Sequence, residues 1–468
     1  MTVRFGPDEG WRRLHPLSPL VRFGRGVLAV LTLVGLSASG AIGDGSVSPW
    51  YELAIAAVAA VAAVINWLVT RWKVDGVTLR IETGLLRRDS RQLPVARIQA
   101  VDLVRPFFAR MLGLAELRVR LAGHNGADGR LAYLTEPAAL ALRARLLAAH
   151  HGLDPATPEP SEQIMVTVPA GRLIGSAMVH ALGLAVVVVA AGAGLALVSP
   201  AGLVAAAGSL VWWLVLSASL VWQRVSSQYG FTVAASGDGV RIRRGLLGTV
   251  AETIPVARIQ AVRMIEPLLW RPFGWRRLEV DVAGHPGHDR GEGPESGRKA
   301  LLAVGGWDDA RSLIRVAVGR GEPVLTRPPR RARWKAPVRY HYLAAGHNEA
   351  IAVTVTGRLR RLTTWVPLAK AQSVRFVQGP VQRRLGLATV HLDVAGRHVG
   401  AEFAERGAGE ARRLAGELAA LGRTARRRAA LAAVPPQPPP GGEPGDGLAG
   451  GGQAASVASP VNAAHRRA

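Results

Sequence analysis

Three recurring pairs of cationic and amide side chains are the residues of this sequence best suited to chemistry. The octapeptide Pro-Val-Ala-Arg-Ile-Gln-Ala-Val occurs at residues 94–101 and 255–262, and a looser copy, Pro-Leu-Ala-Lys-Ala-Gln-Ser-Val, occurs at 367–374. The paired side chains are Arg97 and Gln99, Arg258 and Gln260, and Lys370 and Gln372. Residues two apart in a strand share one face, so each pair forms either a structural bracket or a contact surface.

No motif of a known catalytic or metal site accompanies these pairs. The chain has no cysteine, which excludes a cysteine nucleophile and thiolate zinc sites. P-loop, zinc-protease and nucleophile-elbow patterns are absent as well. We therefore expect a protein that is not an enzyme, with no cofactor, no metal site and no small-molecule substrate.

His180 is the one ionisable residue inside a long apolar run. An ionisable residue within a membrane span is a functional candidate by default. Because His180 has no charged partner in any of the apolar runs, the sequence favours an interhelical hydrogen bond. Participation in a transport pathway is the alternative interpretation.

Positive charge is concentrated in one linker. The chain has 58 Lys and Arg against 33 Asp and Glu, a net charge of +25, and residues 320–339 include Arg330, Arg331, Arg333 and Lys335. Each such cation near an anionic leaflet contributes on the order of 1 kcal/mol of attraction. Nucleic acid attracts the same charges, but no recognition-helix pattern is present, so we expect no specific nucleic-acid binding. A solvated linker is the alternative to lipid contact.

Apolar residues are gathered in three runs. Residues 26–43 and 53–70 lack charges, and residues 173–223 form a longer run with a turn sequence at 199–202. A spanning helix needs about 20 apolar residues, so these runs predict two transmembrane hairpins, four helices in all. Lys and Arg flank both hairpins on one side only, which places both termini and the large segments in the cytoplasm.

The remaining segments repeat three times in register. A glycine precedes each repeated proline by ten residues, an arginine follows it by sixteen, and a second glycine follows it by nineteen: Gly84, Gly245 and Gly357; Arg110, Arg271 and Arg383; Gly113, Gly274 and Gly386. Alternating apolar and polar residues predict strands, for example at 239–243. A helix closes each module, and Asp308 is the expected N-cap of the second one.

A membrane hairpin followed by this spaced motif resembles the bacterial pleckstrin-homology-like, membrane-flanking domain of YdbS/YdbT-like proteins, and three copies resemble the three-module YdbT-type branch. The resemblance implies a seven-stranded barrel closed by a C-terminal helix. The expected fold class is thus an α+β membrane protein with four transmembrane helices and three such barrels. The expected segments are an N-terminal segment (1–20), hairpin 1 (21–71), module 1 (72–152), a linker (153–171), hairpin 2 (172–223), module 2 (224–320), a basic linker (321–338), module 3 (339–430) and a disordered tail (431–468).

These observations predict a non-enzymatic, polytopic protein of the bacterial inner membrane. Its three cytoplasmic modules would serve as a membrane-proximal scaffold or as a surface for lipids and proteins. The expected partners are membrane lipids, anionic ones among them, and, as the resemblance implies, a smaller single-module YdbS-like protein. A component of a transport or channel complex is the alternative function.

Overall fold

The alternating segments of all three modules form strands in this computed structural model, and the longest apolar run forms two helices. The structure describes residues 10–21, 57–58, 61–62, 64–75, 78–84, 89–121, 129–151, 162–198, 200–237, 239–283, 298–319, 321–396 and 400–432.

Module 1 consists of two groups of strands and a covering helix. The first group is a sheet of four strands: β1 (Arg12–Arg13), β2 (Arg71–Asp75), β3 (Thr78–Thr83) and β4 (Asp89–Pro94). The 3-10 turn η1 (Val95–Arg97) leads to the second group: β5 (Ile98–Arg105), α3 (Phe107–Met111), β6 (Leu114–Leu121), β7 (Gly129–Thr135) and α4 (Glu136–His151). β1 precedes the first two apolar runs in the sequence, and it pairs with β2, which follows both of them.

Module 2 repeats this order around a helical hairpin. β8 (Gln163–Thr167) precedes the hairpin helices α5 (Ala170–Val198) and α6 (Pro200–Gln228) and pairs with β9 (Thr232–Ser236) after them. The other elements are β10 (Gly239–Arg244), β11 (Thr249–Ile254), η2 (Val256–Arg258), β12 (Ile259–Pro267), η3 (Leu268–Phe273), β13 (Arg276–Val282), β14 (Arg298–Gly305) and α7 (Trp307–Val318). The hairpin is therefore an insertion between the first two strands of its module.

Module 3 has counterparts of the last six of these strands, and an isolated bridge between Thr326 and Ala345 takes the place of the first strand and the hairpin. Its elements are α8 (Ala332–Lys335), η4 (Tyr340–Tyr342), β15 (Ala344–His347), β16 (Ile351–Thr356), β17 (Arg360–Pro367), η5 (Leu368–Lys370), β18 (Ala371–Val377), α9 (Pro380–Arg384), β19 (Leu387–Val394), β20 (Ala401–Gly407) and α10 (Ala408–Ala432).

The repeated proline opens a 3-10 turn at the same corner of every module. Pro94, Pro255 and Pro367 precede η1, η2 and η5 with φ of −62°, −61° and −63°. The pyrrolidine ring fixes φ near −65°, so proline suits the residue at which the chain leaves one sheet and enters the next. The expectation that Arg97 and Gln99 lie in one strand is wrong, because Arg97 ends η1 and β5 begins at Ile98.

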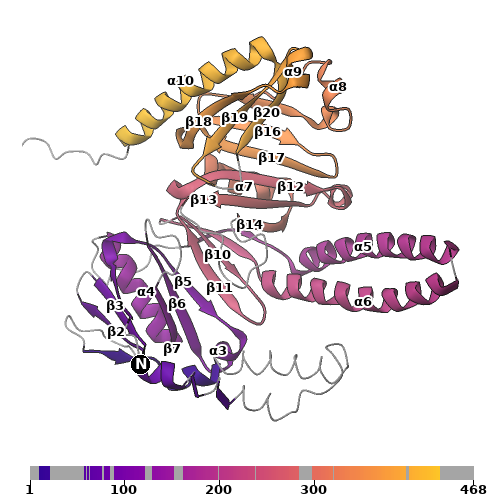
Figure 1. Cartoon of the computed structure of the whole chain (residues 1–468). Coiled ribbons are helices and arrows are strands. Elements are labelled where there is room, and N and C mark those ends of the chain that lie inside the picture. The colour runs from indigo at the N-terminus through magenta and orange to yellow at the C-terminus, as the bar shows by residue number, and fades with distance from the viewer. Residues whose placement is uncertain are drawn as a thin grey trace, which may run out of the picture. The chain divides into compact units, whose positions relative to one another are not determined.

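In modules 1 and 2 the second group of strands joins the first group of the next module (Figure 1). β5 pairs with β11, which gives the sheet order β7-β6-β5-β11-β10-β9-β8, and β12 pairs with β17, which gives β14-β13-β12-β17-β16-β15. Both junctions have one register: Arg105 faces Thr249, and Glu266 faces Arg361. Each pair joins the residue eleven after one repeated proline to the residue six before the next.

The expected fold class, with four transmembrane helices and three closed barrels, is wrong. Among the described residues one helical stretch, Ala170–Gly194, is long and apolar enough to cross a membrane. The span expected at 26–43 lies wholly outside the described residues, and the span expected at 53–70 and the side chains of α6 are described only in part. The described strands form open sheets because the edge of one module pairs with its neighbour instead of closing on itself.

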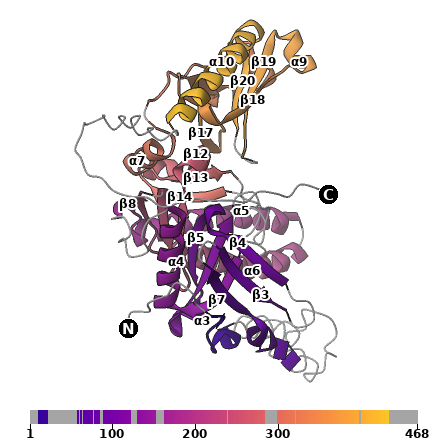
Figure 2. The same cartoon turned by 90° about the vertical axis from the view of Figure 1, so that its left-hand side faces the viewer.

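One helix packs against the second group of strands in each module, and Figure 2 shows α4 and α7 in this position. Leu142 of α4, Leu313 of α7 and Leu418 of α10 lie in the hydrophobic cores of their modules. The expected N-cap at Asp308 is wrong by two positions, because α7 begins at Trp307 after Gly306. An acidic side chain still caps this helix, since the Asp309 carboxylate accepts a 3.0 Å hydrogen bond from the Gly306 amide.

Candidate functional site

The repeated arginines connect one module to the next. A guanidinium nitrogen of Arg110 donates to the carbonyl oxygen of Leu246 at 2.7 Å, and Arg271 donates to that of Arg358 at 2.7 Å. Each acceptor directly follows the repeated glycine of the next module, whose φ is 116° in the first contact and 92° in the second. Glycine adopts such positive φ values at little cost. The repeated arginine of one module and the turn at the repeated glycine of the next module are therefore the two partners of one intermodule contact.

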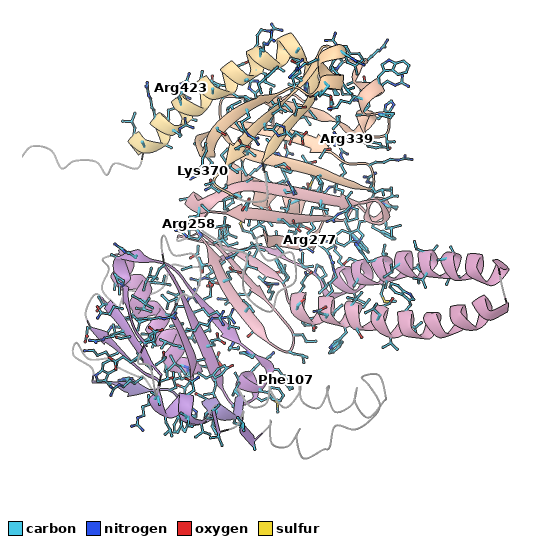
Figure 3. The ribbon with its side chains drawn as sticks, viewed as in Figure 1. Phe107, Arg258, Arg277, Arg339, Lys370 and Arg423 are labelled. Carbon is cyan, nitrogen blue, oxygen red and sulfur yellow. The ribbon has the colours of Figure 1, made fainter. Side chains whose placement is uncertain are left out.

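The second and third octapeptides meet at the turn η2. Arg258 is half-buried, and this burial lowers the pKa of its guanidinium. Gln260 is buried and donates from Nε2 to the Arg258 carbonyl oxygen at 3.1 Å. The Lys370 ammonium of module 3 donates to the carbonyl oxygen of Ala257, so Lys370 and Arg258 lie at neighbouring corners (Figure 3). These contacts are those of a structural bracket.

The other members of the three pairs do not join this turn. Arg97 and Gln372 are exposed, and the side chain of Gln99 lies outside the described part of the chain. The structure therefore does not bring the five described side chains together into one pocket.

His180 connects the hairpin to module 2. The indole N–H of Trp270 donates to His180 Nδ1 at 2.9 Å, and the two rings meet edge to face with centroids 5.1 Å apart. An indole nitrogen can only donate, so Nδ1 accepts from Trp270 when the ring proton lies on Nε2, whereas the Ser176 carbonyl oxygen, 3.0 Å from the same Nδ1, accepts from the other tautomer. Trp270 is fully buried. The predicted hydrogen bond exists, but it joins α5 to η3 rather than to another helix.

Small residues let α5 approach the same surface. A Cβ atom added at Gly183 would lie 2.4 Å from Leu269 Cδ1, and one added at Gly175 would lie 3.1 Å from the Trp275 ring. Leu173 of the same helix belongs to the core of module 2. The first turns of α5 are therefore packed as part of module 2, and the hairpin extends from that base.

Module 3 has a short basic loop at the position of the hairpin. Val166 and Val233 pair on either side of the hairpin, and Thr326 and Ala345 pair on either side of residues 327–344. Val233 and Ala345 each precede the repeated proline of their module by 22 residues. We call residues 327–344 the replacement loop.

Two cations of the replacement loop hold it to module 3. Arg331 donates to the Gly386 carbonyl oxygen at 3.1 Å, and the Lys335 ammonium lies 2.7 Å from a carboxylate oxygen of Glu405. Glu405 is buried, so its charge requires such a partner. Both residues are exposed, but these contacts tie the segment to module 3 at two positions.

Three other side chains of the loop project into solvent. Trp334 is 82% exposed, and Arg330 and Arg333, which both precede it, are exposed as well. Val338 is 58% exposed a few residues later. An exposed tryptophan between cations is the composition found at membrane–water interfaces.

Arg406 fastens the start of the loop. Its guanidinium donates to the carbonyl oxygens of Thr326 at 2.7 Å and of Ala345 at 3.0 Å, and it pairs with Glu410 at 3.3 Å. Burial lowers the pKa of Arg406, and the Glu410 carboxylate acts in the opposite direction. The two strands from which the replacement loop emerges are thus held by one buried cation.

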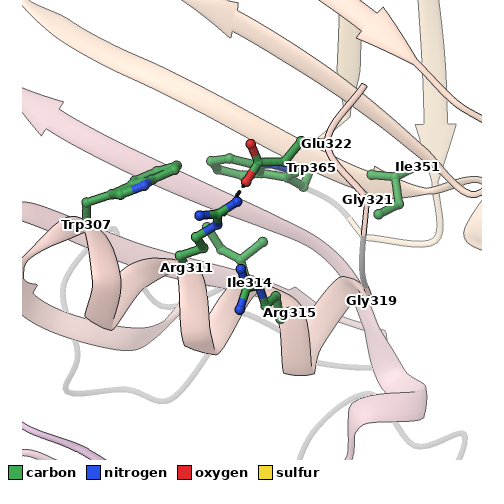
Figure 4. A pocket seen from close by; sticks show the side chains of 9 residues that line it. All are labelled: Trp307, Arg311, Ile314, Arg315, Gly319, Gly321, Glu322, Ile351 and Trp365. Carbon is green, nitrogen blue, oxygen red and sulfur yellow. Dashed lines mark ion pairs between the residues drawn. The ribbon is translucent and has the colours of Figure 1, made fainter. Parts of the chain in front are cut away.

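A cavity of about 510 Å³ lies between α7 and the first strands of module 3 (Figure 4). Trp307 and Trp365 are among its lining residues, and Arg311 forms an ion pair with Glu322 at 3.2 Å across it. The lining includes no serine, histidine, lysine or aspartate. The apolar side chains of the lining suit the binding of an apolar group. Arg315 provides a positive charge for an anionic group of the same ligand.

The family model of the bacterial PH domain matches the chain three times, at residues 27–150, 177–315 and 300–421. These matches cover more than half of the sequence. The chain belongs to the bacterial PH domain family. Comparisons with curated proteins and with solved structures found no match. The resemblance to bacterial PH domains is thereby confirmed, and the assignment to the YdbT-type branch stays a prediction.

The second family match joins the hairpin helices to module 2 of this bacterial PH protein, in agreement with the packing of α5 on η3. Sequence reasoning missed Trp270 and Trp365, which no motif marks. The expected segments place a basic linker, and not a hairpin, before module 3, and the aromatic and basic residues of that linker were the available signal for the replacement loop. The described residues contain no cluster of three potential metal ligands.

Proposed function

We propose that this bacterial PH protein is a membrane-anchored, non-enzymatic scaffold in which the α5–α6 hairpin inserts into the inner membrane. The observation that carries the proposal is the exposure of the hairpin. The apolar stretch of α5 is only 17% buried, whereas the core helix of a soluble protein is mostly buried. Leu182 and Val186 of α5 and Leu214 of α6 each expose well over half of their surface.

The charges at the base of the hairpin support a cytoplasmic location for the modules. Arg172 lies in the first turn of α5 and Arg224 lies near the end of α6, both on the side that joins module 2. Lys and Arg are retained on the cytoplasmic side of membrane spans. We infer that both helices cross the bilayer and that module 2 lies in the cytoplasm directly beneath them.

Module 3, in this proposal, contacts anionic lipid through its replacement loop. Arg330 and Arg333 supply charge, and Trp334 supplies an apolar ring with a polar edge. Each cation adds on the order of 1 kcal/mol at an anionic surface, so the loop is a weak second contact beside a strong anchor. The transport alternative is less favoured, because His180 is engaged by Trp270.

A fluorescent label on the replacement loop tests the lipid contact. The chain has no native cysteine, so an environment-sensitive dye on Val338→Cys reports one position of the full chain in nanodiscs. We expect a blue shift of emission in discs with anionic lipid and none in zwitterionic discs. The double variant Arg330→Ser/Arg333→Ser removes the shift, because it removes the two projecting charges.

The matched control is the same dye on Val324→Cys, an exposed residue of module 3 that precedes the loop. Its emission should ignore lipid charge. Equal emission of the Val338→Cys label in both kinds of disc would refute the lipid contact.

A further inference from the structure

Module 3 has a strand edge that corresponds to the paired edges of modules 1 and 2. Among the described residues, no strand pairs with this edge in module 3. β5 and β12 each pair with a strand of the following module. β18 is their counterpart, because all three strands follow the proline turn. In the described part of the chain β18 pairs with β19 alone and forms the edge of its sheet.

The side chains on β18 have the character of a buried junction. Phe376 lies nine residues after its repeated proline, and its counterparts Leu103 and Met264 are buried, whereas Phe376 is 36% exposed. Val377 is 42% exposed, and its counterpart Ile265 is buried. The guanidinium carbon of Arg412 in α10 lies 5.8 Å from the centroid of the Phe376 ring. The ring is still partly exposed beside this side chain. An exposed edge with apolar side chains is a template for another strand.

The arginine of the intermodule contact is also present without its acceptor. Arg383 corresponds to Arg110 and Arg271, which each donate to a carbonyl oxygen of the next module. Arg383 is exposed, and no side-chain hydrogen bond joins it to another described residue. The apolar edge and the arginine are thus the contribution of module 3 to one junction whose other side is unoccupied among the described residues.

The first module of a second copy of this chain does not suit the junction. In the register shared by both junctions, Arg375 would face Arg91 and Val377 would face Asp89 of β4. Like charges directly opposite each other destabilise a strand pair. The strands that do occupy such junctions carry Val250 or Leu362 at the position of Asp89.

We propose that the β18 edge is a docking site for a different chain, which adds the strand before the proline turn of its own bacterial PH module. This strand carries an aliphatic residue five positions before its repeated proline, to face Val377. It carries a neutral or acidic residue three positions before that proline, to face Arg375. Arg375 is held in place by Asp393, whose pKa the Arg375 hydrogen bond lowers. Main-chain hydrogen bonds supply affinity and the facing side chains supply selectivity.

Site-specific photocrosslinking of the full chain in its native cells tests this proposal. A benzophenone amino acid replaces Val377, and one replacing Val324 serves as the exposed control in the same module. We expect an adduct from Val377 to a second protein that carries a bacterial PH module. Mass spectrometry should map the bond to the strand before the repeated proline of that module.

The Arg383→Ala variant separates this junction from chance proximity. Loss of one charge-assisted hydrogen bond should lower the adduct yield about tenfold. An adduct to a second copy of this chain, an adduct to a protein without such a module, or a yield no greater than that from Val324 would each overturn the proposal. The readout does not depend on lipid contact by the replacement loop.

Discussion

Replacing Trp270 with alanine is expected to lower the free energy of unfolding of the chain by about 3–5 kcal/mol, the range for removing a large aromatic side chain from a core. Trp270 is fully buried and holds the hairpin through His180. The substitution therefore opens a cavity in module 2 and also releases α5. Denaturant unfolding of the full chain in detergent micelles measures the effect.

Trp270→Phe is the matched variant, because it keeps most of the ring volume and removes only the N–H donor. We expect it to cost about 1 kcal/mol, the net value of one hydrogen bond. If the alanine and phenylalanine variants were equally stable, or if both unfolded like the native chain, the packing of the hairpin on module 2 would be wrong.

Replacing Arg406 with methionine is expected to destabilise module 3 by about 2–4 kcal/mol, because several hydrogen bonds from one buried charged donor are lost. Methionine retains much of the side-chain volume, so the loss reflects the guanidinium contacts with Thr326 and Ala345. The replacement loop should also become more accessible to protease, since both strands at its base are released. Thermal unfolding and limited proteolysis of the full chain measure these two effects.

Arg311→Ala is the control for this experiment, because Arg311 forms an exposed ion pair with Glu322. Exposed pairs contribute about 0–1 kcal/mol. Equal stability of the Arg406 and Arg311 variants would contradict the structural role assigned to Arg406.

The sequence was sufficient to predict where the modules turn, but not what the turning residues contact. The repeated prolines and glycines mark positions with fixed or positive φ, and these are local properties that spacing reveals. Arg110 and Arg271 were noted from the same spacing, but their acceptors lie in the following module. The sequence of a single copy of the repeat contains no information on which residues of the next copy it contacts.

Closed barrels were expected because the family resemblance implies a barrel for each module taken alone. Strand pairing between β5 and β11 or between β12 and β17 joins edges 93 to 148 residues apart, which no local pattern encodes. Trp270 was missed for a similar reason, because its partner His180 comes from the inserted hairpin. The replacement loop was visible as a basic segment, and only the pairing of Thr326 with Ala345 places it where module 2 has its hairpin.

Insertion of the α5–α6 hairpin into the bilayer is the central claim, and a spin label at Val186→Cys in proteoliposomes tests it most directly. Val186 is 62% exposed on α5, and the absence of native cysteines makes the label unique. Oxygen partitions into the hydrocarbon core, whereas a water-soluble nickel chelate stays outside. We predict that the label collides readily with oxygen and is shielded from the chelate. Ready collision with the chelate would show that the hairpin lies in water and would contradict the membrane-anchored scaffold.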